Sequence, residues 1–270
     1  MGRRYETISF LSDYGHVDEF VGVVHSVVRG IAPHARVIDI GHEVAPHDVR
    51  AGALTLVRAV QYLAPGIVMA VVDPGVGTDR RAIAVSVGDD DEAVFLGPDN
   101  GLLAPAVAMV GGPFRVVELT APAFHLEGPG PSFAGRDIFA PVAAHLCNGV
   151  DLDDLGPPVD PDSLVPGLVP LARREGEGLE AEVLWVDRFG NVQLNVGPDD
   201  VGAFGDRVAV RWAGEVRTAV RIETYDDLGA GELGLMVDSY GLMALTLNRS
   251  SAADELGLHA GDAVALRAAG

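Results

Sequence analysis

Short apolar runs bounded by glycine, proline or aspartate recur through the first half of the chain. They are rich in β-branched and aromatic residues, which is typical of buried strands. Between several of them, apolar residues return at helical spacing, in residues 18–31, 48–63 and 138–148. Strands that alternate with helices predict an α/β domain with a mixed, mainly parallel sheet flanked by helices. The expected strands are residues 7–13, 36–40, 66–70, 82–85, 93–96 and 115–119.

The pattern changes in the last third of the chain. Residues 151–178 are dense in proline, glycine and acidic residues, which indicates a domain boundary. After them come short segments, several of them alternating, with no long helical pattern, and these predict a smaller all-β, barrel-like domain. The predicted organisation is an α/β domain at 1–165, a linker at 166–178 and a β-barrel-like domain at 179–270. The expected strands are residues 179–185, 192–196, 207–212, 216–222, 234–237, 243–247 and 263–266.

Composition and charge exclude several classes of partner. The chain has 270 residues, of which 48% are hydrophobic, and a net charge of -20. Such a charge repels nucleic acid and anionic lipid, so we expect neither as a partner, and it favours a cationic ligand. No apolar run reaches the length of a membrane span, and the N-terminus lacks the apolar core of a signal peptide. The single cysteine, Cys147, precludes an internal disulfide, so a cytoplasmic protein is expected.

Three carboxylates, Asp13, Asp73 and Asp187, stand at predicted strand ends or turns, each followed within a few residues by glycine. Carboxylates accept hydrogen bonds and therefore suit ribose hydroxyls, amino groups and cations. The segment from Asp73 to Arg80 adds a nearby cation, and charged groups at such a turn are often displayed at a site. The alternative is structural: each aspartate caps its own turn, with residues 71–81 forming a hairpin-like connection.

Other chemistries fit the sequence less well. The Gly75-Val76-Gly77 pair is an incomplete dinucleotide fingerprint, because Arg80 stands where the third glycine belongs, and no phosphate-binding loop or serine-hydrolase elbow is present. His42 and His47 could bind a metal, but Pro46 interrupts any helix that would align them. Helix capping by Asp48 and core packing by Cys147 are the favoured roles of those residues.

Taken together and in order, the motifs resemble a known family. The chain is similar to the S-adenosyl-L-methionine (SAM) hydrolases, also called SAM hydroxide adenosyltransferases, and to their relatives the fluorinase and chlorinase. The resemblance extends over nearly the whole chain, and its specificity lies in the order of the segments. They are FLSDYG (10–15), IDIGHEV (38–44), VDPGVGT (72–78), LGPDNGL (96–102), FAGRDIFAP (133–141), DRFGNV (187–192), SYG (239–241) and LN (247–248).

The resemblance implies hydrolysis of SAM to adenosine and L-methionine by attack of water or hydroxide on the ribose C5′, without a cofactor or a metal. It implies that Asp13 holds the ribose hydroxyls. It assigns acidic contacts with the methionine or ribose part to Asp18 and Asp187, the latter taking the amino group. Further implied substrate contacts are Gly135, Asn191, Ser239, Asn248 and Arg249, with Asn191 and the backbone of the last two near adenine.

Two positions bear on the branch of the family. The halogenases carry tyrosine where this chain has Asp73, whereas the hydrolases carry aspartate there and an arginine at the position of Arg80. The resemblance therefore implies Asp73 and Arg80 as the catalytic pair and water as the nucleophile. It also implies that the extra loop of the fluorinase is missing, because residues 87–93 pass directly between strands.

One position departs from the family pattern. The hydrolase motif has a histidine between Phe133 and Gly135, and here that residue is Ala134. Either two residues suffice, or another group such as His125 substitutes, or the activity is altered, or the alanine is an engineered replacement. A SAM-dependent chlorinase and a non-catalytic adenosine- or SAM-binding protein thus remain alternatives. The family arrangement implies a homotrimer, with ligands between the α/β domain of one subunit and the β domain of the next.

Overall fold

A computed structural model describes residues 2–88 and 91–269 of the chain. The chain divides into two compact units, residues 1–169 and 170–270, and the division falls inside the predicted linker. No helix in the described part is both long and apolar enough to cross a bilayer. The direct passage expected at 87–93 includes residues 89 and 90, which lie outside the described residues.

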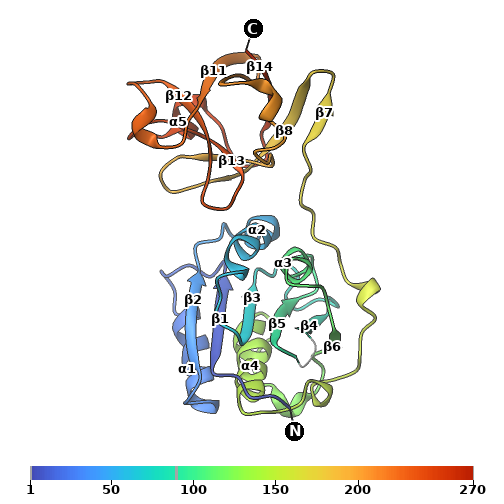
Figure 1. The fold of residues 1–270 in the computed structure, drawn as a ribbon. Coiled ribbons are helices and arrows are strands. Elements are labelled where there is room, and N and C mark those ends of the chain that lie inside the picture. Colours follow the sequence, from blue (N-terminus) through green and yellow to red (C-terminus); the bar gives the residue numbers. More distant parts are fainter. Residues whose placement is uncertain (1, 89–90, 270) are drawn as a thin grey trace. The chain divides into compact units, whose positions relative to one another are not determined.

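Six strands of the described chain form the sheet of the first unit, in the order β2-β1-β3-β5-β4-β6 (Figure 1). The strands β1, β2, β3 and β5 run parallel, and β4 is antiparallel to both β5 and β6. This confirms the mixed, mainly parallel sheet. It also shows that the hairpin-like connection is wrong, because β5 lies between β3 and β4. The bounds are β1 Thr7–Ser12, β2 Arg36–Gly41, β3 Ile67–Val71, β4 Ala82–Val87, β5 Ala93–Pro98 and β6 Arg115–Glu118.

Helices cover both faces of this sheet (Figure 1). On one face α1 and α4 share an apolar core with side chains such as Phe10, while on the other α2 and α3 pack against side chains such as Leu11. The side chains of successive residues in β1 thus pack on opposite faces of the sheet, as expected for a β-strand. The bounds are α1 Phe20–Ile31, α2 Val49–Val60, α3 Ala104–Met109 and α4 Ala140–Cys147.

The N-termini of the helices agree only in part with those predicted from the sequence. Asp48 caps α2, since its side chain accepts a hydrogen bond from Ala51 N at 2.8 Å, which confirms the predicted cap. The α1 helix begins at Phe20, two residues after the expected start, so Asp18 and Glu19 precede it and its first turn holds no acidic residue. The helix α3 was not predicted, because six residues are too few for a helical period to emerge.

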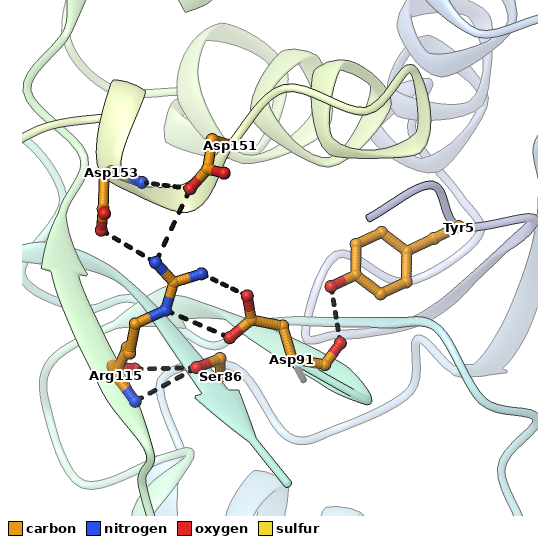
Figure 2. Close-up of polar contacts among 6 residues, drawn as sticks. All are labelled: Tyr5, Ser86, Asp91, Arg115, Asp151 and Asp153. Atoms are coloured by element: carbon orange, nitrogen blue, oxygen red, sulfur yellow. Dashed lines mark hydrogen bonds and ion pairs between the residues drawn. The ribbon is translucent and has the colours of Figure 1, made fainter. Parts of the chain in front are cut away.

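A cluster around Arg115 ties distant segments together at the edge of the sheet where the parallel strands begin (Figure 2). The Arg115 guanidinium pairs with Asp91 and lies 3.0 Å from Asp153 Oδ1 and 3.6 Å from Asp151 Oδ1. The Tyr5 hydroxyl donates to the Asp91 carbonyl at 2.8 Å, and burial raises the pKa of Tyr5 to about 12. These contacts join the N-terminal segment, the turn before β5 and the chain after α4, at the edge opposite Asp13 and Asp73.

The second unit is a closed barrel, as the sequence predicted. Its described strands follow the order β14-β10-β11-β12-β13-β9-β8-β7, and pairing of β14 with β8 closes seven of them into a ring. The short helix α5, Ala252–Leu256, is capped by Ser251. The strand β7 falls within the predicted linker. The bounds are β7 Arg173–Glu175, β8 Gly178–Val186, β9 Val192–Leu194, β10 Arg207–Trp212, β11 Glu215–Arg221, β12 Leu233–Val237, β13 Met243–Thr246 and β14 Ala263–Ala268.

Candidate active site

Asp73 and Arg80 form a forked ion pair at the carboxyl end of β3. Arg80 Nε lies 2.9 Å from Asp73 Oδ1 and 3.0 Å from Oδ2, and the Nη2 group of Arg80 also donates to Oδ2. Their side chains are only 5% and 14% exposed, so water screens the pair little. A guanidinium that donates twice to one carboxylate fixes its plane as well as its position. The Arg80 guanidinium also lies over the ring of Phe139, 5.7 Å from its centroid.

The loop between Asp73 and Arg80 folds back on itself through two tight turns. Val76 N donates to the Asp73 carbonyl at 3.1 Å, and Thr78 N donates to the Gly75 carbonyl at 3.2 Å. Gly77 has a φ of 80°, a region that residues with a side chain rarely adopt. A Cβ on Gly75 would lie 3.2 Å from Arg80 Cγ, so the absence of a side chain there lets the arginine return to Asp73. The two glycines therefore serve the geometry of the ion pair.

Asp13 leaves β1 beside Asp73, because β1 pairs in parallel with β3 and Ser12 is opposite Val71. Asp13 Oδ2 accepts a hydrogen bond from the backbone N of His47 at 2.9 Å. His47 has a φ of 69°, an unfavourable conformation for a residue with a Cβ. The strained backbone of His47 points its N–H toward Asp13 and thereby fixes the orientation of the Asp13 carboxylate, and such strain often occurs at functional sites.

Tyr14 links Asp13 to the segment that carries Ala134 and Gly135. Burial, together with the charges of Asp13 and Asp73, raises the pKa of Tyr14, whereas the backbone of Gly135, by hydrogen bonding, acts in the opposite direction. A Cβ on Gly135 would lie 2.3 Å from that hydroxyl oxygen, so only glycine fits there without movement. Gly135 opens a π-helical turn, Gly135–Phe139, that leads into α4. Such turns are frequent at functional sites.

A cavity of about 320 Å³ lies beside Arg80, and Ala134 forms part of its wall. Thr78 and Asp137 contribute polar groups, and Ile138 an apolar one. Ala134 itself is buried. His125 is not among the residues that line this cavity, and its buried Nε2 has no hydrogen-bond partner within the described part of the chain. The space next to Arg80 is therefore not filled by a substitute imidazole from His125.

The second unit carries a pocket of about 650 Å³, a size typical of small-molecule sites. Asn191, Asn248 and Arg249 line it, together with the exposed aromatic rings of Phe189 and Tyr225. Aromatic faces beside amide groups suit a flat heterocycle with polar edges.

Asp187 and Asn191 form a connected network next to this pocket. Asp187 Oδ1 accepts from the backbone N of Phe189 and of Asn191, at 2.8 and 2.9 Å. Asn191 Nδ2 donates to Asp187 Oδ2 at 2.8 Å, and Asn191 Oδ1 accepts from the Thr246 hydroxyl at 2.5 Å. Asp187 thus closes its own turn in this structure. Its Oδ1 already accepts two hydrogen bonds, whereas its Oδ2 accepts one and retains capacity to accept another.

Comparison with known proteins identifies the family. Residues 8–156 match the SAM hydroxide adenosyltransferase N-terminal domain, and residues 181–265 match the C-terminal domain of that name. The chain belongs to the SAM hydroxide adenosyltransferase family. The two matched domains fall in the two compact units, so each unit corresponds to one family domain.

Individual relatives agree with this assignment. The chain is 48% identical over 255 residues to the (R)-S-adenosyl-L-methionine hydrolase of Salinispora tropica, covering 94% of this chain and 95% of the relative. It is 27% identical to the fluorinase of Nocardia brasiliensis, with 98% of each chain covered. A crystal structure of an uncharacterized conserved protein from Thermotoga maritima superposes with a TM-score of 0.88 at 34% identity, covering 96% of this chain and 99% of the other.

The structure brings the sequence-predicted residues together in two sets, one on each unit. Asp13, Asp73, Arg80 and Gly135 gather in the first unit around Tyr14. Asn191, Asn248 and Arg249 share the pocket of the second unit, with Asp187 bonded to Asn191. Asp18 lies exposed in the turn before α1, and Ser239 lies exposed in the turn between β12 and β13.

His42 and His47, the two histidines weighed above as metal ligands, lie in different surroundings. His42 is buried, with Nδ1 2.7 Å from the Ser12 hydroxyl and Nε2 3.0 Å from Asp39 Oδ1. The Ser12 hydroxyl thus occupies Nδ1, and Nε2 lies against Asp39 without a well-formed hydrogen bond, whereas His47 lies exposed.

Sequence reasoning missed Tyr14, Tyr225 and, as a pocket residue, Phe189. Tyr14 stands directly after Asp13 in the segment FLSDYG, and Phe189 stands inside DRFGNV, so the sequence carried a signal for both residues. An exposed phenylalanine between two polar site residues is itself such a signal. Nothing in the sequence near Tyr225 connected it with Asn191, because that contact spans 34 residues across the barrel.

Proposed function

We propose that the protein hydrolyses S-adenosyl-L-methionine to adenosine and L-methionine, with water attacking the ribose C5′. The observation that carries the proposal is the forked pair of Asp73 and Arg80 at the strand end beside Asp13. The relatives named as hydrolases carry the (R) epimer in their names, and we extend that preference to this chain.

The difficult step is activation of the nucleophile. Water has a pKa near 15.7 and an ordinary aspartic acid one near 3.9, so full proton transfer before attack would cost about 16 kcal/mol. Asp73 therefore orients the water and accepts its proton late, as the oxygen–carbon bond forms. Arg80 fixes the carboxylate so that one lone pair is aimed at the water, and its positive charge stabilises hydroxide character in the attacking oxygen.

The leaving group needs no help from the protein. The sulfonium departs as a neutral thioether, so neither a general acid nor a metal has a task, and we propose a reaction without a cofactor. One proton must leave the water, and Asp73 is the group placed to take it. The acidic chain also favours a substrate that carries a positive sulfur.

The binding residues divide the substrate between them. Asp13 accepts hydrogen bonds from the ribose hydroxyls, and the pocket with Phe189 and Tyr225 stacks adenine between aromatic faces, near Asn191 and Asn248. Asp187 takes the amino group of the methionine part, and Asp18 contacts the methionine part or the ribose. Ser239 makes a further contact with the substrate, and the backbone of Arg249 lies near adenine. Gly135, which has no side chain, allows the substrate to approach the backbone closely.

A homotrimer with sites at subunit interfaces belongs to this proposal, and light scattering on the purified protein tests it. A cytoplasmic location does as well, because a chain with one cysteine has no internal disulfide to maintain.

The test is to incubate the purified protein with SAM, with and without chloride, and to separate the products. The expected result is adenosine and methionine in equal amounts, with the same yield in both samples. Formation of 5′-chloro-5′-deoxyadenosine would identify a chlorinase instead. Intact SAM after long incubation, together with tight binding of adenosine, would replace the hydrolase by a nucleoside-binding protein.

A further inference from the structure

A buried polar chain runs behind Asp13, from β2 through His42 to the loop at the end of β1. His42 and Ser12 are almost completely buried, at 1% and 0% exposure. The Ser12 hydroxyl lies 2.7 Å from His42 Nδ1, and it accepts a hydrogen bond from the Tyr14 backbone N at 3.3 Å. On the other side of the ring, His42 Nε2 lies 3.0 Å from Asp39 Oδ1. This contact is short, but its angle is too far from linear for a regular hydrogen bond.

The directions of these contacts are mutually consistent. A carboxylate only accepts, so the hydrogen of His42 belongs on Nε2, toward Asp39, and Nδ1 is left to accept from the Ser12 hydroxyl. The serine oxygen is then free to accept from Tyr14 N–H. Burial lowers the pKa of His42, with His16 and His25 acting in the same direction and Asp39 opposing them, which keeps the ring neutral as this chain requires. Hydrogen bonds aligned in this way strengthen one another.

His42 holds the same loop a second time through its backbone. The His42 carbonyl accepts a hydrogen bond from Gly15 N at 2.7 Å. Residues 12–15 are therefore attached to His42 at both ends, by Ser12 through the ring and by Gly15 through the carbonyl. Asp13 and Tyr14, the two side chains that face the candidate active site, lie between these attachments.

We propose that His42 and Ser12 are positioning residues for the reaction: they fix the loop 12–15 so that the Asp13 carboxylate meets the ribose hydroxyls. Neither residue touches the substrate. The inference rests on the proposed function for the identity of the ligand, whereas the attachment of the loop can be tested without any ligand.

The chain offers a matched control on the same strand. Ser9 also belongs to β1 and is fully buried, but within the described residues its hydroxyl has no hydrogen-bond partner. Ser9→Ala and Ser12→Ala thus remove the same group from the same strand, but only Ser12→Ala removes a contact with His42. In hydrogen exchange without ligand, we expect faster exchange of amides 13–15 in Ser12→Ala alone, with the rest of β1 still protected. Equal exchange in both variants would overturn the proposal.

The second measurement compares adenosine with 2′,3′-dideoxyadenosine, which lacks the ribose hydroxyls. If Ser12 acts through Asp13, Ser12→Ala weakens adenosine binding about three- to tenfold and leaves binding of the dideoxy compound unchanged. A general structural defect would weaken both equally and would contradict the proposal. Absence of adenosine binding by the unaltered protein would contradict the proposed function itself, and this is seen before any variant is compared.

Two substitutions of His42 separate its two contacts. The amide of His42→Asn reaches the place of Nδ1 and keeps a partner for Ser12, whereas that of His42→Gln reaches the place of Nε2 and keeps the contact with Asp39. We expect His42→Asn to retain adenosine affinity better than His42→Gln. The reverse order would show that the Asp39 side of the chain matters instead, and would overturn the role given to Ser12.

Discussion

Arg80 Nε lies between the two carboxylate oxygens of Asp73, at 2.9 and 3.0 Å, within a loop that returns on itself in seven residues. This contact leaves the carboxylate little freedom to rotate, because two donors of one rigid guanidinium define its plane. Since Asp73 stands where β3 ends, beside Asp13 at the end of β1, the fixed carboxylate faces the same edge of the sheet as the proposed ribose contact.

Asp73→Asn tests the carboxylate as proton acceptor. The amide keeps nearly the same shape but cannot take a proton, so we expect kcat to fall by about 10²–10⁴-fold with a small change in KM. Asp79→Asn is the matched control, because Asp79 is an exposed acid in the same loop. Steady-state kinetics on both variants measure the difference, and equal rates would rule out the role of Asp73.

Arg80→Lys tests the fork rather than the charge. Lysine preserves the positive charge but cannot donate twice in one plane, so the carboxylate gains freedom. We expect kcat to decrease by at least about tenfold, with the fold intact by circular dichroism. Turnover equal to that of the unaltered protein would mean that charge alone suffices.

Ala134→His tests the cavity beside Arg80. The space of about 320 Å³ accommodates an imidazole, which would provide a second proton acceptor next to the pair. We expect kcat to rise about tenfold or more, whereas Ala134→Phe, which fills the space without a nitrogen, should lower it. A faster Ala134→Phe variant would indicate that packing, not proton transfer, limits the reaction.

Gly135→Ala tests the contact with Tyr14. The added Cβ would lie 2.3 Å from the Tyr14 hydroxyl, so the ring must move away from Asp13 and Asp73. We expect weaker SAM binding in this variant. Adding Tyr14→Phe removes the clashing oxygen, so the double variant should bind better than the sum of the two single losses allows. A double-mutant cycle of KM values measures this coupling, and simple additivity would refute the contact.

The pH dependence of stability follows from buried histidines. Burial lowers the pKa of His42, His125 and His145 below the usual value of 6.5. In the window below about 6.5 the unfolded chain binds protons that the folded chain does not, so these residues make the protein less stable as pH falls. His125→Phe should lessen the drop in melting temperature between about pH 7 and 5 and leave turnover unchanged. His259→Gln, at an exposed site, is the control that should change neither.

Much of the fold was predictable because its signals are local. The buried strand β3 and the capped helix α2 follow from short-range patterns of apolar residues and from Asp48. The position of β5 between β3 and β4 was not predictable from the chain around Asp73, because strand order depends on contacts distant in sequence. For the same reason the cluster around Arg115, whose members lie between residues 5 and 153, could not be predicted from any single motif.

The candidate site was predictable where residues follow one another, and less so where the fold brings them together. Asp73 and Arg80 are separated by one loop, and the catalytic roles proposed for them rest on a family resemblance over the whole chain. The closeness of Tyr14 to Gly135, and of Tyr225 to Asn191, required the structure, since each pair joins different elements. The cavity beside Ala134 likewise depends on how the loop after β3 packs against the turn before α4.

Hydrolysis of SAM in ¹⁸O-labelled water, followed by mass spectrometry of both products, tests the central claim most directly. Water that attacks C5′ places one ¹⁸O atom in the 5′-hydroxyl of adenosine and none in methionine. Unlabelled adenosine, a label in methionine, or SAM that persists unchanged would contradict the account.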